Sequence, residues 1–455
     1  MNNKMDIPLR QLVWPVFLEN LLRISLTSVD VLMLTAFSQK AVAAVGLIQQ
    51  FTFFIQLLYL MVTVGASIII SQSLGARLFR DAGLAGLGSL ILVSELALVL
   101  SVIVVFSADH ILSLYQLEAS VHTYAREFLI IYGGASIFVA INMAQGSILR
   151  AWGYSFDPML VNIIANILNI IGNAICLMGW MGLPVFGVKG VACSTMFSQF
   201  VACVILGYMM YRRKDVNLPL RELHRVPPRI YRMILSVGIP TAGENLSYNI
   251  GQILIMNIIA KMGTVAMSTY VYAITVLRFV FIPALSIGMG AQIKVGYFAG
   301  AGLQSEVYGR VYRYLIMGFF TSLILVCLVN MGKPLILPIL THDHEVLSLL
   351  TSVLLISLLH EPGRSLNLIM IPSLKGAGDV RFPVLIGMIV VWGVGVFFSY
   401  LFGIVMNLGI VGVWMALVID EWVRGLLMVA RWRSGVWKEK SLVSACSKIT
   451  PAFPS

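Results

Sequence analysis

The sequence predicts an all-α polytopic membrane protein with twelve transmembrane helices in two pseudo-symmetric six-helix bundles. Hydrophobic residues make up 59% of the 455 residues and charged residues only 11%, whereas a soluble domain carries about 25% charged residues. Apolar runs of about 20 residues, the length that crosses a bilayer, recur along the whole chain. Short motifs of the first half also return at a fixed offset in the second half.

Twelve apolar runs are long enough to cross a bilayer as helices. They cover residues 12–36, 44–72, 88–108, 123–147, 158–181, 188–210, 231–259, 267–294, 311–332, 346–371, 383–405 and 409–430. Several of these runs exceed the minimum length for a span, so we expect tilted or kinked helices.

An internal repeat divides these runs into two sets of six. Pro15 and Glu19 reappear 225 residues later as Pro240 and Glu244. Proline and glycine dominate the matches because they fix the backbone shape that two copies of one fold share. Two similar bundles facing each other are typical of transporters that expose a central site to either side of a membrane. Further matches are Gly65 with Gly290, Gly75 with Gly300, Arg150 with Lys375, and Pro158 with Pro383.

The basic residues predict the orientation of the chain. Twenty-two of the 31 Lys and Arg residues fall on the side of the termini, and five fall on the opposite side. This asymmetry predicts cytoplasmic termini in the plasma membrane, which is the inner membrane if the source is Gram-negative. The net charge of +11 is then explained by basic loops beside anionic lipid, and we expect no nucleic-acid partner.

The predicted organisation has four parts. Residues 1–210 form an N-lobe with the first six spans, and residues 231–433 form a C-lobe with the last six. A basic cytoplasmic linker, residues 211–230, joins the lobes, and residues 434–455 form a cytoplasmic tail.

Enzyme chemistry is not expected from this sequence. The five cysteines have no metal spacing, the six histidines form no ligand set, and no phosphate-binding or dinucleotide-binding glycine motif is present. We therefore expect no cofactor. Because the chain has no room for a nucleotide-binding domain, the energy for transport must come from an ion gradient or from a partner.

Charged residues inside the predicted spans are costly at bilayer depth, by about 2.5–3.5 kcal/mol each. Helical spacing predicts that several form ion pairs within one helix. Arg278 has no acid within a helical turn, and Glu244 on the preceding span is its simplest partner. The predicted intrahelical pairs are Glu19 with Arg23, Glu361 with Arg364, and Glu421 with Arg424.

Asp30 differs from these residues because no basic side chain lies within one helical turn of it. A buried carboxylate of this kind can exchange a proton, or bind a small cation together with neutral oxygens. Asn166, Asn169 and Asn173 lie three and four residues apart, so they place amide oxygens on one face of the fifth span. Asp30, Asn169 and Asn173 would form a sodium site in the second case. An interhelical hydrogen-bond seam is the structural alternative for the asparagines.

The repeat favours a functional role for this cluster. Asp30 corresponds to Ile255, Asn169 to Val394, and Asn173 to Phe398 at the 225-residue offset. A polar cluster that folding requires should appear in both halves, so its absence from the second half indicates an ion site in the first lobe. The candidates for a substrate cavity or second polar site are Glu19, Glu244, Tyr248, Gln252, Arg278 and Glu361.

These motifs together resemble the multidrug and toxic compound extrusion (MATE) family over nearly the whole chain. The resemblance rests on Trp14–Glu19, Ser28–Asp30, Ala41–Gly46, Leu168–Asn173 and Gly187–Thr195. It implies an antiporter that exports amphipathic, often cationic small molecules against an inward flow of protons or sodium ions.

The resemblance also implies roles for particular residues. Asp30, Asn169, Asn173 and Thr195 match the family's cation site in the first lobe. Some members carry an acid on the seventh span, where this chain has Tyr248 and places Glu244 one turn earlier.

Two other classes of protein stay open at this stage. A flippase of lipid-linked oligosaccharide precursors has the same broad architecture, but it needs a cationic cavity for pyrophosphate. A membrane-embedded enzyme needs a nucleophile–base pair or metal cluster that the sequence does not show. For the antiporter, we expect a functional monomer and predict that Asp30 lies within about 7 Å of both Asn169 and Asn173, so that one ion or water bridges them.

Overall fold

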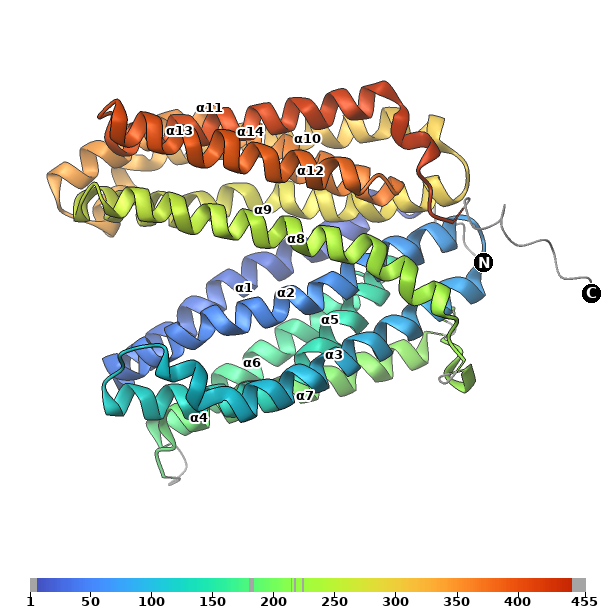
Figure 1. Cartoon of the computed structure of the whole chain (residues 1–455), viewed down its shortest axis with the longest axis horizontal. Helices are drawn as coiled ribbons and strands as arrows, with labels where there is room; N and C mark the ends of the chain where they lie inside the picture. Colours follow the sequence, from blue (N-terminus) through green and yellow to red (C-terminus); the bar gives the residue numbers. More distant parts are fainter. Residues whose placement is uncertain (1–5, 180–183, 214, 217, 223–224, 444–455) are drawn as a thin grey trace, which may run out of the picture.

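A computed structural model describes residues 6–179, 184–213, 215–216, 218–222 and 225–443. Within these residues the chain is helical apart from short turns, and the helices form two bundles (Figure 1). The first bundle contains α1 to α7, and the second contains α8 to α14. This arrangement confirms the predicted all-α fold with two pseudo-symmetric lobes.

Six spans build the N-lobe, and the fourth is bent. The bend of 48° lies between α4 and α5, where Ala135 interrupts the helix. The helices are α1 (Leu9–Phe37), α2 (Gln39–Gly75), α3 (Phe79–Ser113), α4 (Ala119–Gly134), α5 (Ser136–Ala151), α6 (Phe156–Met178) and α7 (Gly187–Arg212).

The C-lobe repeats this order, except that its fifth span contains two π-helical segments, η4 (Val391–Val396) and η5 (Leu401–Val405). A short 3-10 helix, η3 (Leu220–Glu222), lies in the linker before α8, and another, η6 (Val436–Glu439), follows α14. The helices are α8 (Pro228–Ala260), α9 (Thr264–Gly300), α10 (Gln304–Leu340), α11 (His344–Ala377), α12 (Arg381–Val390), α13 (Phe397–Tyr400) and α14 (Gly409–Ser434).

Most of these segments are apolar enough to cross a membrane on their own. Among the described residues, eight helices pass this test, and the bent pair α4–α5 makes a ninth. The remaining long helices are α1, α8 and α14, which carry the buried or half-buried acids Glu19, Glu244 and Glu421. The charges therefore lower the hydropathy of the helices in which they lie. With these three, the bundles contain the twelve predicted spans.

The two lobes meet through reciprocal contacts between equivalent residues of α2 and α9. A Cβ atom at Gly75 would lie 2.0 Å from the carbonyl oxygen of Tyr297, and one at Gly300 would lie 1.8 Å from that of Gln72. Gly75 and Gly300 are equivalent in the repeat, and so are Gln72 and Tyr297. Because the same ends of α2 and α9 meet, the repeats run parallel and are related by an axis along the helices, not by an inverted axis.

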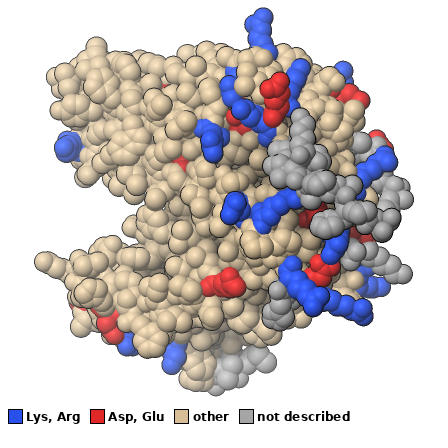
Figure 2. All heavy atoms as spheres, turned by 45° about the vertical axis from the view of Figure 1, so that its right-hand side comes forward, with Lys and Arg blue, Asp and Glu red and all other residues tan. Residues whose placement is uncertain are grey.

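Hydrogen bonds across the lobe boundary follow the same symmetry. Gln72 Nε2 donates to the carbonyl oxygen of Gly376 at 2.8 Å, and the Tyr297 hydroxyl donates to that of Ala151 at 2.6 Å. The backbone N–H of Leu442, beyond α14, donates to Gln72 Oε1 at 2.9 Å. These contacts close the molecule at the end that carries both termini. The lobes diverge toward the other end, where Figure 2 shows a deep hollow between them.

The start of the linker is held against the N-lobe. Arg213 donates two hydrogen bonds to the Asp157 carboxylate, at 2.9 and 3.0 Å. The Tyr154 hydroxyl, in the turn between α5 and α6, donates to Asp215 at 2.6 and 2.7 Å. Burial and the neighbouring Asp215 raise the pKa of Tyr154 to about 12, so this hydroxyl keeps its proton at neutral pH.

Candidate functional site

The N-lobe brings three of the predicted site residues together between α6 and α7. Asn169 Nδ2 donates to the Thr195 hydroxyl at 3.1 Å, and Asn173 Nδ2 lies 3.4 Å from Asn169 Oδ1. The Ser194 hydroxyl donates to the carbonyl oxygen of Asn169 at 3.1 Å. The amides of Asn169 and Asn173 and the Thr195 hydroxyl therefore belong to one seam between α6 and α7. The asparagine spacing predicted the shared face of the amides, and the place of Thr195 came from the resemblance. Asn169 and Asn173 are buried.

Asp30, the fourth residue of this predicted site, has a side chain that lies outside the described residues. Its backbone belongs to α1, and α1 packs against α6, the helix of the two asparagines. The distance from Asp30 to Asn169 and Asn173 stays a prediction. No three His, Cys, Asp or Glu side chains of the described part of the chain gather as metal ligands, so a sodium site here depends on Asp30 and neutral oxygens.

Glu19 does not pair with Arg23, and that prediction is wrong. Its carboxylate lies 3.1 Å from Arg150 Nη1 and accepts a hydrogen bond from Asn162 Nδ2 at 2.8 Å. Arg23 Nη2 instead donates to Asn20 Oδ1 at 2.9 Å. Asn162 lies on α6, which packs against α1, and Arg150 lies on the last turn of α5, so helical spacing within α1 misassigned the pair.

The pair predicted between Glu244 and Arg278 is also wrong. Glu244 Oε2 lies 2.5 Å from Lys375 Nζ, whereas the Arg278 side chain is exposed on α9. Glu244 and Lys375 are the equivalents of Glu19 and Arg150 at the 225-residue offset. The same ion pair thus braces both lobes, and the matched acid and base in the repeat were the signal that could have identified it.

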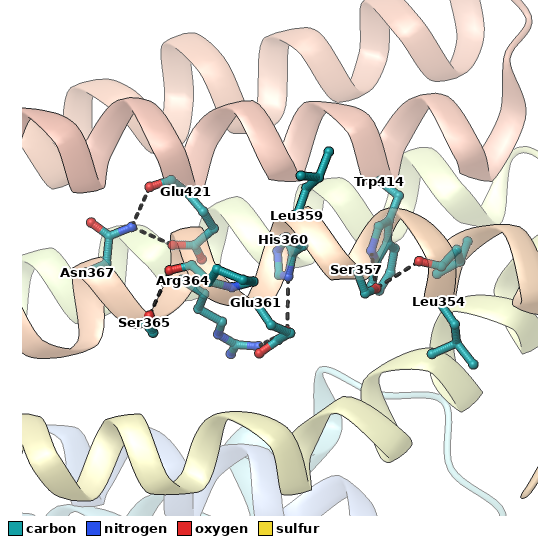
Figure 3. A network of polar contacts seen from close by, with 12 residues as sticks. Leu354, Ser357, Leu359, His360, Glu361, Arg364, Ser365, Asn367, Trp414 and Glu421 are labelled. Carbon is teal, nitrogen blue, oxygen red and sulfur yellow. Dashed lines mark hydrogen bonds and ion pairs between the residues drawn. The ribbon is translucent and has the colours of Figure 1, made fainter. Parts of the chain in front are cut away.

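The C-lobe also contains a buried network of charges on α11 and α14. Glu361 on α11 is 1% exposed, and its Oε1 atom lies 3.7 Å from Arg364 Nη1, which confirms the predicted pair. His360 Nδ1 lies 3.0 Å from the same oxygen. Figure 3 shows Glu361 and Arg364 projecting from α11 on the side facing away from α14.

The α14 part of the network has one arginine between two acids. Arg424 pairs with Glu421 at 3.3 Å, as predicted, and also with Asp420. Asn367 on α11 donates to the Glu421 carboxylate at 2.6 Å and to its carbonyl oxygen at 2.7 Å, so it links the two helices (Figure 3). Asp420, Asn367 and His360 were missed at the sequence level. Asp420 lies four residues before Arg424, so the spacing used for Glu421 could have found it.

Acids outnumber arginines in this network. On α11, Glu361 pairs with Arg364 and His360, and on α14, Asp420 and Glu421 share Arg424, so three acids meet two arginines and one histidine. Glu361 Oε2 and Asp420 Oδ1 are buried without a hydrogen-bond partner among the described residues. Each of these two carboxylates meets its arginine through the other oxygen, so both acids are only partly satisfied within the described residues.

A cavity of about 230 Å³ adjoins this network inside the C-lobe. Among the predicted residues, Glu244 and Tyr248 line it, and the Tyr248 ring lies 5.6 Å from the Arg424 guanidinium. Gln252 lies deeper along α8 and accepts a hydrogen bond from Tyr270 at 3.3 Å. The further polar residues lining this cavity are Asn245, Arg364, Asn367, Glu421 and Arg424.

Glu19, Gln252, Arg278 and Glu361 lie outside this cavity lining. Glu19 is in the N-lobe and Arg278 is exposed on α9, so of the six candidates this cavity contains Glu244 and Tyr248.

Comparison with known proteins agrees with this fold and with the position of the repeat. The family model MatE matches residues 15–175 and again residues 240–401, so the two matches start 225 residues apart. The uncharacterized transporter YisQ of Bacillus subtilis is 34% identical over 431 residues, which cover 95% of each chain. The probable multidrug resistance protein NorM of Thermotoga maritima is 26% identical over 95% of this chain and 93% of that protein.

Solved structures show the same fold at lower identity. An outward-facing multidrug resistance MATE family transporter superimposes with a TM-score of 0.88 at 20% identity, covering 98% of this chain and 97% of the other. A MATE crystal structure in a bent conformation gives 0.86 at 20% identity, covering 97% and 96%. The family match and the 34% identical relative define a polytopic membrane transporter. The chain belongs to the MATE family of transporters.

Proposed function

We propose that this transporter is a cation-coupled antiporter, which exports amphipathic, often cationic small molecules in exchange for protons or sodium ions. The observation that carries the proposal is the buried excess of carboxylates over arginines beside the C-lobe cavity. A carboxylate in an apolar bundle is stabilised when a proton or cation neutralises it. A group that is neutral in one lobe arrangement and charged in another supplies the differential binding that coupling requires.

The N-lobe seam supplies a second candidate coupling site. Asn169 and Thr195 present an amide and a hydroxyl at 3.1 Å from each other, and such neutral oxygens suit a small cation shared with a carboxylate. Asp30 would be that carboxylate. The hypothesis of a proton or sodium site at Asp30, Asn169 and Asn173 therefore forms part of the proposal.

The lobe arrangement supports alternating access. Cross-lobe hydrogen bonds close the end that carries the termini, and a hollow opens at the other end. We propose that the closed end faces the cytoplasm of the plasma membrane, because Lys and Arg gather around it in Figure 2. In this orientation the hollow opens outward. We also propose that the transporter works as a monomer without a cofactor.

The flippase alternative is less well supported by the cavity. The two arginines that line the cavity, Arg364 and Arg424, are both paired with acids. They therefore offer little free positive charge to a pyrophosphate group.

Transport in proteoliposomes tests the proposal. Uptake of a lipophilic cationic dye is measured under an imposed pH gradient and, separately, under an imposed sodium gradient. We expect one gradient to drive wild-type transport, Asp30→Asn to abolish coupling, and Glu361→Gln to weaken it. The control is Glu118→Gln. Glu118 is an exposed acid that pairs with Lys40 at the end of the molecule away from the cross-lobe hydrogen bonds, so this variant should transport normally.

Two results would contradict the proposal. If neither gradient drives transport by the wild type, the protein is not a cation-coupled antiporter. If both Asp30→Asn and Glu361→Gln remain fully coupled, neither residue is a coupling site.

A further inference from the structure

A surface groove between α8 and α12 lies apart from the polar network of the C-lobe. Its volume is about 580 Å³, and it is lined by Arg232, Leu235, Ser236, Ile239, Pro240 and Arg381. Arg232, Leu235, Ser236 and Ile239 are separated along α8 by three, one and three residues, so they occupy one face of that helix. The opposite face carries the buried residues Ile230, Ile234, Val237 and Thr241. The groove therefore faces outward from the bundle.

The two arginines of the groove differ from those of the buried networks. Arg232 and Arg381 are exposed, and neither has an ion pair or hydrogen bond among the residues that the structure describes. No Asp or Glu lines the groove. In contrast, Arg150, Arg364 and Arg424 each face a carboxylate. The groove thus offers two guanidinium groups that an external anion can pair with.

The groove also changes character along its length. Arg232 lies in the second turn of α8, and Arg381 is the first residue of α12, so both lie near the end that carries the termini. Ile239 lies seven residues further along α8, about 10 Å deeper, and is 56% exposed. The groove thus has two arginines at the membrane boundary and the apolar residues Leu235 and Ile239 further toward the bilayer. This distribution matches an anion with an apolar tail.

We propose that this groove binds an anionic phospholipid. Its phosphate would accept hydrogen bonds from both guanidinium groups, whose planar forks suit phosphate oxygens. Its acyl chain would lie along Leu235 and Ile239. The lipid would join the start of α12 to α8, the helix that carries Glu244 and Tyr248 of the cavity. The proposal rests on the cytoplasmic orientation of this end, but lipid binding can be measured without transport.

Native mass spectrometry of the purified full-length transporter tests the site. Phosphatidylglycerol and phosphatidylcholine with identical acyl chains are titrated separately, and bound lipid is counted. We expect preferential retention of one phosphatidylglycerol. Arg232→Gln and Arg381→Gln should each weaken this binding about five-fold, and the double variant about thirty-fold, because each arginine near a charged surface contributes about 1 kcal/mol. The control is Arg313→Gln. Arg313 is an exposed arginine of α10 at the same end of the molecule, and its replacement should leave lipid binding unchanged.

Further measurements distinguish a bound lipid from a free anion and from unfolding of the variants. Arg232→Lys should bind with intermediate affinity, because lysine keeps the charge and loses the planar fork. Unchanged thermal unfolding without added lipid shows that the double variant is folded. Equal retention of phosphatidylcholine would overturn the proposal. Displacement of the lipid by inorganic phosphate as readily as by competing phosphatidylglycerol would identify a free-anion site and would also overturn it.

Discussion

The hydroxyl of Tyr297 donates a 2.6 Å hydrogen bond to the carbonyl oxygen of Ala151, and this bond joins the C-lobe to the N-lobe. Its counterpart runs from Gln72 to the carbonyl oxygen of Gly376, so here the donor lies in the N-lobe and the acceptor in the C-lobe. The two bonds are equivalent under the repeat. Any movement that opens this end must break both bonds together, because each links one lobe to the other.

Tyr297→Phe should make the closed end open more often. The substitution keeps the ring and leaves the carbonyl oxygen of Ala151 without its donor, which costs about 0.5–1.5 kcal/mol in the closed state. We expect the population of the open state to rise by up to about tenfold. Electron paramagnetic resonance distances between spin labels at Arg77 and Ser305, both exposed near this end on different lobes, measure that population.

The matched control is Tyr59→Phe. Tyr59 is also buried, but its hydroxyl bonds to Ser136 inside the N-lobe at 2.9 Å. It should lower thermal stability slightly and leave the distance distribution unchanged. An identical shift in both variants would show that general loosening, and not the cross-lobe bond, moves the lobes.

Gly300→Ala should prevent the lobes from closing fully. Its Cβ atom would lie 1.8 Å from the carbonyl oxygen of Gln72, a backbone atom that cannot turn aside. The spin-label distance at this end should therefore lengthen. Gly309→Ala is the control, because nothing lies within 4 Å of its added Cβ atom, and alanine in a helix stabilises it by about 0.5–1 kcal/mol. Unchanged distances in Gly300→Ala would argue against the tight α2–α9 contact.

The sequence predicted the lobes better than the charge pairs, and the reason is physical. Glycine and proline report the local backbone, so the match of Gly75 with Gly300 indicated equivalent positions of α2 and α9, which are the positions where the lobes meet. Ion pairs between helices depend on packing, which helical spacing does not contain. Glu19 therefore had Arg23 as its predicted partner, although its carboxylate contacts Arg150.

The repeat held information on packing that spacing lacked. Arg150 and Lys375 match at the same offset as Glu19 and Glu244, and a pair kept in both copies indicates a contact. One local difference also follows from the repeat. Gly387 stands where the N-lobe has Asn162, and its added Cβ would lie 3.2 Å from Glu244 Oε1. The C-lobe thus lacks the amide donor that the N-lobe acid receives from Asn162.

Asn169→Ala should weaken transport more than Asn249→Ala. Asn169 Nδ2 donates to the Thr195 hydroxyl in the N-lobe seam, whereas Asn249 Nδ2, within the described part of the chain, donates to the carbonyl oxygen of Asn245 on its own helix. Removal of an oxygen ligand from a sodium site should raise the half-saturating sodium concentration, while Asn249→Ala leaves it unchanged. Dye transport at a series of sodium concentrations measures this effect. Equal behaviour of the two variants would assign the seam to packing alone.

Arg424→Met should destabilise the C-lobe more than any single replacement of its acids. The variant leaves Asp420 and Glu421 buried together without their shared cation, and breaking a buried pair in this way costs about 3–5 kcal/mol. Glu421→Gln keeps the size of the side chain, the hydrogen bond from the Asn367 amide and the Asp420–Arg424 pair, so its thermal unfolding temperature should stay close to that of the wild type.

The triple variant Asp420→Asn, Glu421→Gln and Arg424→Met contains no unpaired charge in this part of the network. It should regain most of the stability lost in Arg424→Met, because the loss comes from uncompensated charge and not from packing. If the triple variant unfolds as readily as Arg424→Met, the guanidinium stabilises this region through its packing against Tyr248, and the charge argument for the network is wrong.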